Sequence, residues 1–218
     1  MSVRRLILFI AIIAVLFGVP SACIALAGRT ESPTAERHSP LTIRSDHDDG
    51  RGSPSPGDVG AVAHTSNPES FAVSVAWALF DWDTTASVPL NDYTGRLLAV
   101  ADPSGEESAG LVTDLSTYLP SPASWADLTG YRVRQWIDID GYVVPDTWDQ
   151  TKTDDAGHEI AAGTTAYTVT GLRRRSGTWQ GKQAQTVDEV SFTIFMTCRP
   201  TYDTCKLLRL SQLNHPLP

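Results

Sequence analysis

An uncharged apolar run over residues 6–27 separates a short basic end from the rest of this 218-residue chain. Its 22 residues would form a helix about 33 Å long, enough to cross the ~30 Å hydrocarbon core of a bilayer. Arg4 and Arg5 precede the run, and basic residues that flank a span stay on the cytoplasmic side. We therefore expect residues 1–5 to be cytoplasmic, residues 6–27 to anchor the chain in the lipid bilayer, and the remainder to lie outside.

Two alternatives for the amino end keep the same orientation. Ala-Leu-Ala, ending at Ala27, has the small-x-small pattern of a signal cleavage site, and cleavage there would release a secreted protein. Cys23 is the candidate acylated residue of a lipoprotein, although Pro20 stands where a leucine-like residue is required. Each of the three interpretations places the carboxyl-terminal part of the chain outside the cytoplasm.

Residues 28–66 have the composition of a flexible linker. Ser, Thr, Pro, Gly, Asp and His dominate, and no aromatic residue occurs. Such a segment buries too little apolar surface to offset its ordering entropy, so we expect a disordered linker spanning ~30–40 Å. His47 lies among Asp46, Asp48 and Asp49, but a metal site needs ligands held by a fold. We expect neither a metal nor a cofactor.

Residues 67–218 have the length of one domain. The first half carries helix-start signals, each followed by apolar residues at helical spacing. The predicted starts are Asn67-Pro68-Glu69, Asn91-Asp92, the capping box Ser104 to Glu107, and Ser121-Pro122. The first helix is expected to bury Phe71, Val75, Leu79 and Trp82.

The second half carries strand patterns. The predicted strands are Tyr131–Val144, Thr164–Arg175, Val187–Cys198 and Cys205–Leu213. Alternation places Ile137, Ile139 and Val143 on one side of the first strand, and Ser176-Gly177 reads as a turn. Helices followed by adjacent strands predict an α+β domain in which helices pack on a curved antiparallel sheet.

Cys198 and Cys205 lie on either side of the last predicted hairpin turn. In an oxidising compartment this spacing predicts a disulfide that closes the hairpin. Closing so short a loop contributes ~2.5 kcal/mol in the chain-entropy model.

The order of anchor, linker and domain resembles a known family. The resemblance is carried by the segments Asn67-Pro68-Glu69-Ser70-Phe71, Trp77 to Trp82, Asp92-Tyr93-Thr94 and Arg96 to Pro103, with the terminal hairpin. The chain is similar to membrane-anchored proteins of Gram-positive conjugative elements, whose outer domain has the cone fold of nuclear transport factor two and ketosteroid isomerase. The inner-membrane scaffold subunit of type IV secretion machines has the same layout. The resemblance implies a cone fold and an assembly role.

Catalytic residues are sought among acids that a cone-fold isomerase would use in an apolar cavity. The candidates are Asp81, Asp83, Asp138, Asp140 and Tyr93. Asp138 and Asp140 share a strand face with arginines, which is typical of a solvated outer face, and Asp81 and Asp83 flank a helix end. His158 and His215 fall in a predicted loop and in the tail, too scattered to indicate a base–nucleophile pair. We expect no enzyme.

Binding residues are easier to propose. Trp148 and Trp179, in predicted loops, and the basic cluster Arg173-Arg174-Arg175 are candidates for partner contacts. Trp77, Trp125 and Phe192 would line a ligand pocket if the core were open. Residues 67–149 have a net charge of −10 and residues 150–218 of +2, which favours contacts between complementary surfaces and no nucleic acid.

These observations predict a non-enzymatic, membrane-anchored assembly protein with an extracytoplasmic interaction domain, accessory to a conjugation-like channel. Its partners are expected to be other membrane-associated proteins, with a homo-oligomer as a further possibility. The first alternative is an extracytoplasmic ligand-binding or transport-accessory cone domain. The second is a cone-fold isomerase or hydrolase, which requires a carboxylate inside the cavity.

Overall fold

The computed structural model describes residues 59–150 and 160–218, so the predicted anchor and most of the predicted linker lie outside the described residues. No helix within those two described ranges has the length and apolarity that crossing a bilayer requires. The elements in chain order are α2 (Pro68–Phe80), β1 (Trp82–Asp83), α3 (Leu90–Leu98), α4 (Ser108–Tyr118), α5 (Pro122–Gly130), β2 (Arg134–Val143), β3 (Thr164–Trp179), β4 (Lys182–Thr197) and β5 (Lys206–Leu210).

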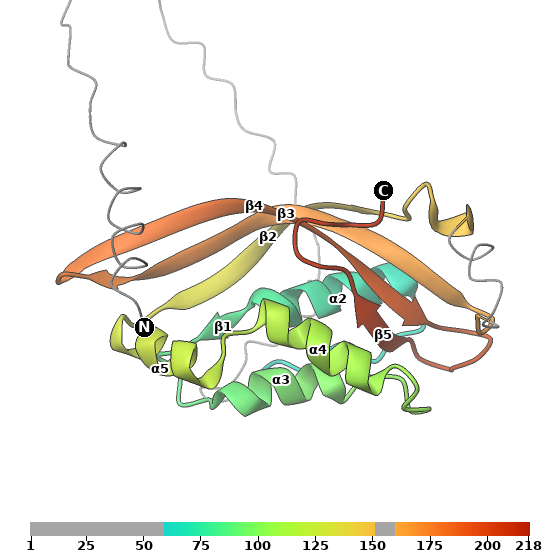
Figure 1. Ribbon diagram of the computed structural model, residues 1–218, viewed down its shortest axis with the longest axis horizontal. Coiled ribbons are helices and arrows are strands. Elements are labelled where there is room, and N and C mark those ends of the chain that lie inside the picture. The colour runs from blue at the N-terminus through green and yellow to red at the C-terminus, as the bar shows by residue number, and fades with distance from the viewer. Residues whose placement is uncertain (1–58, 151–159) are drawn as a thin grey trace, which may run out of the picture. The chain divides into compact units, whose positions relative to one another are not determined.

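The five strands form one antiparallel sheet in the order β1-β2-β3-β4-β5. The sheet is curled into a half-barrel, and helices α2 to α5 lie on its concave side (Figure 1). The predicted mixture of helices first and an antiparallel sheet second is therefore confirmed. The core lies between the two layers, where α2 contributes the fully buried Phe71, Val75 and Leu79.

Helix α2 begins as its sequence predicts. Asn67 is the N-cap, and its side-chain oxygen accepts a hydrogen bond from the backbone N–H of Ser70 at 2.8 Å. Pro68 occupies the first helical position, where it needs no hydrogen-bond acceptor. The helix ends at Phe80, however, so the prediction that Trp82 belongs to its apolar stripe is wrong. Trp82 lies in β1, opposite Gln135 of β2.

Replacing Asn67 with Ala should lower the free energy of unfolding by about 1 kcal/mol, because one backbone donor of the first helical turn then loses its acceptor. Asn67→Asp supplies the same acceptor and should stay within a few tenths of a kcal/mol of the wild type. Urea unfolding followed by tryptophan fluorescence measures both variants, since all six tryptophans lie beyond residue 76. Equal losses in the two variants would contradict the capping role.

Helix α4 does not use the predicted capping box. Its N-cap is Glu107, which makes no side-chain capping bond. Ser104 Oγ instead accepts from the backbone N–H of Glu106 at 3.3 Å and bonds the carboxylate of Asp102. The carboxylate of Glu107 pairs with Arg209 of β5 at 3.2 Å, so a contact between distant segments replaces the local cap.

A β-bulge in β2 reverses the predicted orientation of Val143. The pairing register between β2 and β3 shifts between Ile139 and Gly141. One extra residue in a strand moves every later side chain to the opposite face. Ile137 is 4% exposed on the helix side as predicted, but Val143 is 62% exposed. The prediction that these two residues share a face is wrong.

Strands β3 and β4 are longer than predicted. Ser176-Gly177 is not a turn, because both residues pair with β4, and β3 continues to Trp179. The two-residue turn is Gln180-Gly181, whose φ angles are 49° and 74°. A type I′ hairpin turn requires positive φ at both central residues, and glycine adopts positive φ without steric cost.

The folded part extends into the segment that the sequence assigns to the linker. Val62 is 1% exposed and belongs to the core. The backbone N–H of Ala63 donates to Ser74 Oγ at 2.7 Å, and that of Cys205 donates to the carbonyl of Thr65 at 2.8 Å. The predicted boundary at residue 66 therefore lies too late in the chain.

The buried face of β4 and the disulfide that follows it are as predicted. Val190, Phe192, Ile194 and Met196 of β4 all face the helices and are at most 3% exposed. The disulfide between Cys198 and Cys205 is present and joins the end of β4 to the start of β5. Both cysteines are buried, at 4% and 1% exposed, so the bridge is part of the core.

Candidate interaction site on the β3–β4 hairpin

The end of the β3–β4 hairpin projects past the rest of the sheet. Pairing between β2 and β3 ends at Ser176, opposite Arg134, whereas β3 and β4 remain paired to Trp179 and Lys182. We call residues 177–184 the hairpin arm. Figure 1 shows it reaching beyond the end of β2. From Lys182 to Glu189, every residue of β4 is exposed.

One side of β4 lacks a neighbouring strand in the arm and in the residues that follow it. Strand β5 pairs only with residues 194–197 of β4. The carboxyl-terminal tail, residues 211–218, covers the next part of the edge, where the backbone of Thr193 bonds Ser211 and the backbone of Ser191 bonds Asn214. Within the described residues, the outer side of residues 182–190 therefore has no partner strand. We call this stretch the open edge.

The backbone alternation along β4 shows which groups of the open edge are free. Ser191 and Thr193 direct their N–H and C=O groups outward, toward the tail. Because these directions alternate in an antiparallel strand, the odd-numbered residues 183, 185, 187 and 189 also direct theirs outward. Such a row of unpaired backbone groups is a template for another strand.

The predicted contact residues Trp179 and Trp148 lie in different environments. Trp179 is 55% exposed in the hairpin arm, and its ring lies 5.1 Å from that of Tyr131, which is 44% exposed. Trp148 is only 6% exposed and packs against Phe195 at 5.9 Å. Trp179 is therefore the tryptophan of this pair that is placed for contact with another molecule.

The three predicted arginines alternate between the two faces of β3. Arg174 lies on the outer face and forms an ion pair with Asp138. Arg173 and Arg175 lie on the helix-facing side, since they pair with Ile137 and Gln135 of β2. They do not form one continuous basic patch.

Each helix-facing arginine has its own polar contact. The Nη2 atom of Arg173 lies 3.1 Å from the Asp188 carboxylate. The Nε–H of Arg175 donates to Gln135 Oε1 at 2.7 Å, and its guanidinium carbon lies 5.9 Å from the Trp82 ring centre. Burial lowers the pKa of Arg175, neighbouring Arg173 lowers it further, and Asp188 raises it. Arg173 and Asp188 thus balance each other's charge.

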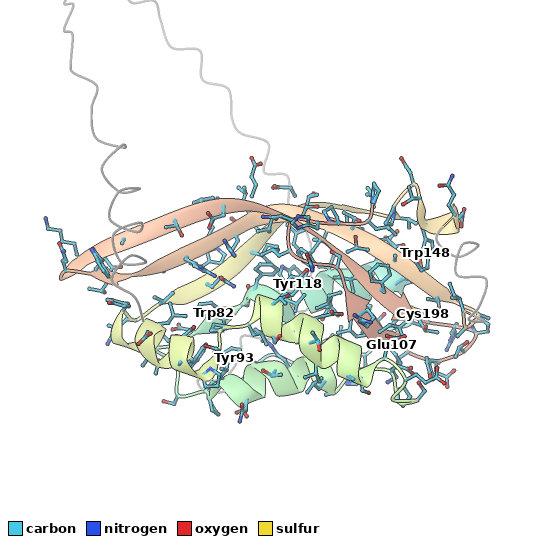
Figure 2. The ribbon with its side chains drawn as sticks, viewed as in Figure 1. Trp82, Tyr93, Glu107, Tyr118, Trp148 and Cys198 are labelled. Carbon is cyan, nitrogen blue, oxygen red and sulfur yellow. A yellow bond between two sulfur atoms is a disulfide. The ribbon has the colours of Figure 1, made fainter. Side chains whose placement is uncertain are left out.

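The predicted pocket residues belong to two separate ring clusters. Phe192 packs against Phe80 at 5.3 Å and Tyr118 at 5.6 Å in the core. Trp125 packs instead against Trp82 at 5.7 Å and Tyr93 at 5.5 Å. In Figure 2, Trp82 and Tyr93 are labelled on the α5 side of Tyr118.

The third predicted pocket residue, Trp77, is partly buried against the core. It lies in the last turn of α2, on the helix that contributes Phe71 and Val75 to the core. Its position gives it a packing role beside the helix.

The candidate acids and the candidate tyrosine make structural contacts. Asp81 accepts from the backbone N–H of Ile137 at 3.3 Å, and Asp83 accepts from that of Thr85 at 2.7 Å. Tyr93 is 5% exposed, and its hydroxyl donates to the carbonyl of Asp83 at 3.3 Å. These contacts position the connection between α2 and β2.

Sequence patterns missed two features of this region. Gln135 is 2% exposed, holds Arg175 and donates to the carbonyl of Phe80 at 3.1 Å. The one sign of this role in the sequence is that Gln135, a polar residue, stands at an inward position of a strand face that is otherwise apolar. The open edge was missed because the strands were predicted to end at Arg175 and to begin at Val187.

The described surface thus offers two kinds of contact. The open edge carries backbone donors and acceptors, and the exposed rings of Trp179 and Tyr131 lie beside β3, on the other side of the hairpin. Both suit association with another chain. Comparison with known proteins adds no relative: no protein-family model, no curated protein and no solved structure matches this chain.

Proposed function

We propose that this chain is a membrane-anchored assembly protein whose outer domain pairs with a second copy through the open edge of β4. The observation that carries the proposal is the row of unpaired backbone groups along residues 182–190 of β4, which begins in the projecting arm and continues along the edge of the sheet. Long open edges in soluble domains are normally covered or blunted, since they template strand addition. Pairing of two copies covers both edges at once.

The charges of the open edge favour one register for this pairing. In an antiparallel pair of identical strands around a two-fold axis at Gln185, Gln183 faces Val187 of the other copy, and their outward backbone groups meet. Lys182 then lies directly opposite Asp188 of the other copy, on the same face, at two symmetric positions. Opposite charges facing each other across strands contribute roughly 0.2–1 kcal/mol per pair.

The wider role of the protein follows from the resemblance noted above. Residues 6–27 would hold the chain in the bilayer and residues 28–66 would tether a cone-fold domain outside the cytoplasm. Paired domains beneath or around a conjugation-like channel would act as a scaffold, in the manner of the similar inner-membrane subunit. The contacts of Asp81, Asp83 and Asp138 with backbone or arginine support a binding role, because these acids serve the fold.

A cysteine at the two-fold axis tests the pairing. In a Cys23→Ser background, Gln185→Cys should give a disulfide-linked dimer in membranes under mild oxidation, because the two Cα atoms would lie about 5.5 Å apart. Gln183→Cys is the matched control: it has the same exposure, but its two copies would lie four residues out of register, about 13 Å apart. Non-reducing gels measure the linked fraction. Equal cross-linking at the two positions, or none at either, contradicts the register.

A second variant separates pairing from folding. Val187→Pro removes one outward N–H and should reduce the Gln185→Cys cross-link at least tenfold, because edge positions whose N–H faces solvent tolerate proline. The tryptophan fluorescence of the domain should stay unchanged. A reporter fused after Pro218 tests the orientation, and activity of that reporter only in the cytoplasm would contradict the extracytoplasmic role.

A further inference from the structure

A second site lies on the concave side of the sheet, where Arg175 faces β1 and α5. Among the described residues Arg175 has no carboxylate partner, whereas Arg173, Arg174 and Arg209 each have at least one. A half-buried guanidinium without a counter-ion is uncommon, because desolvating a charge costs free energy that a partner normally offsets. Its environment indicates what kind of partner it would accept.

The orientation of Arg175 is fixed by a buried side chain. Its Nε–H donates to Gln135 Oε1 at 2.7 Å, and Gln135 is itself held by the carbonyl of Phe80 at 3.1 Å. Gln135 is 2% exposed, so this support is rigid. The terminal nitrogens Nη1 and Nη2 make no hydrogen bond to the described residues. A guanidinium held through Nε presents these two nitrogens as a fork that fits two oxygens of one oxyanion.

A row of packed aromatic rings begins beside this guanidinium, with Trp82, and leads away from it on the helix side. Trp82 lies 5.9 Å from the guanidinium carbon, Trp125 packs on Trp82 at 5.7 Å, and Tyr93 packs on Trp125 at 5.5 Å. Trp125 is only partly buried at the edge of the core. An anionic group bound by Arg175 would therefore have apolar and aromatic surface beside it. This surface favours an anion that is carried on an apolar group.

The local charge selects a monoanion. Arg173 is neutralised by Asp188 at 3.1 Å, which leaves Arg175 with one uncompensated positive charge. A carboxylate would balance that charge, whereas a doubly charged phosphate would leave an excess negative charge in a partly desolvated site.

Two buried donors near the same place lack acceptors. Neither Trp82 Nε1 nor Arg173 Nε has a hydrogen-bond partner among the described residues, and Trp82 is 2% exposed. A buried donor without an acceptor has lost its hydrogen bonds to water without a replacement, which destabilises the folded state. These donors lack acceptors and lie next to a cation that lacks an anion. Such a place is suited to bind a group that supplies negatively charged oxygen atoms.

We propose that Arg175, supported by Gln135 and flanked by Trp82 and Trp125, binds the carboxylate of a small monoanion that carries an apolar or aromatic group. The carboxylate accepts two hydrogen bonds from the guanidinium fork, and the apolar group contacts the tryptophans. The site lies on the concave face, and none of the residues that would contact the anion belongs to the open edge, so the site does not depend on the pairing of two copies. Asp188, which neutralises Arg173, is the one residue common to the two proposals.

Titration of the full-length protein in detergent micelles with phenylacetate tests this site. The NMR resonance of the Trp82 indole N–H, identified by its loss in Trp82→Phe, should shift as phenylacetate is added and reach a plateau at saturation. Phenylacetamide, which has the same shape without the charge, should bind at least tenfold more weakly. Phenyl phosphate distinguishes the other oxyanion and should also bind more weakly; tighter binding than phenylacetate would overturn the assignment to a carboxylate. Equal shifts with phenylacetate and phenylacetamide would overturn the anion site.

Neighbouring arginines supply the matched variants. Arg175→Gln should weaken phenylacetate binding at least tenfold, whereas Arg174→Gln, one residue away on the outer face, should change it less than twofold. Arg175→Lys keeps the charge without the fork and should bind with intermediate affinity, which also guards against loss of folding in the glutamine variant. Similar effects of the two glutamine variants would show that the shift does not report contact with Arg175, and the proposal would fail.

Discussion

Phe192→Ala is expected to lower the free energy of unfolding of the domain by about 3–5 kcal/mol. Phe192 is 0% exposed in the middle of β4, and its ring packs against Phe80 of α2 and Tyr118 of α4. The ring therefore joins the sheet to two helices. Truncation to Ala loses the transfer free energy of the ring and leaves a cavity among three rigid elements, which cannot collapse to fill it.

Phe195→Ala is the matched control for this variant. Phe195 lies on the same strand but on the opposite face, where it is partly exposed and packs against Trp148 at 5.9 Å. We expect its loss to cost about 1–2 kcal/mol, since less apolar area leaves the interior. Urea unfolding of the full-length protein in micelles, followed by tryptophan fluorescence, gives both values. A loss at Phe195 equal to or larger than that at Phe192 would contradict the assignment of the core face.

The elements that could be predicted are those whose pattern is local. Alternation from Val190 to Met196 identified the buried face of β4 because its pairing with β3 has no register shift along that stretch. Asn67 followed by Pro68 identified the start of α2, since an N-cap acts within one turn of its own helix. Two cysteines across a short turn predicted their bridge for the same reason.

The elements that could not be predicted depend on distant segments. The bulge after Ile139 leaves no mark in the apolar pattern, so Val143 was assigned to the wrong face. The side chain of Glu107 was expected to complete a capping box with Ser104. It pairs instead with Arg209, which lies about a hundred residues later in the chain. Trp82 fits the helical spacing of α2, yet pairing with β2 draws it into a strand.

The candidate sites show the same division. The cluster Arg173-Arg174-Arg175 is visible in the sequence, but only the pairing with β2 separates its faces and brings Gln135 beneath Arg175. The open edge depends on where β5 stops pairing, and no residue of β4 encodes that position. Both features come from tertiary contacts.

Replacing both bridged cysteines with alanine should lower the free energy of unfolding by about 2–3 kcal/mol. The bridge closes a loop between residues seven positions apart, and the chain-entropy model assigns ~2.5 kcal/mol to a loop of this size. The connection it closes also aligns β5, where Arg209 pairs with Asp114 of α4 at 2.7 Å. The wild type under reducing conditions should match the double variant, and Cys23→Ser should match the oxidised wild type. A double variant as stable as the wild type would contradict the contribution of the bridge.

The same bridge reports the compartment in which the domain folds. If residues 67–218 lie outside the cytoplasm and residues 6–27 are retained, cells lysed in denaturant with a maleimide-linked polymer should show one labelled cysteine, Cys23. Prior reduction should raise the number to three. A retained anchor with three labels before reduction would place the domain in a reducing compartment, where such bridges do not persist. If the chain instead begins at residue 28 and takes up no label before reduction, it has been cleaved after Ala27 and the domain is secreted.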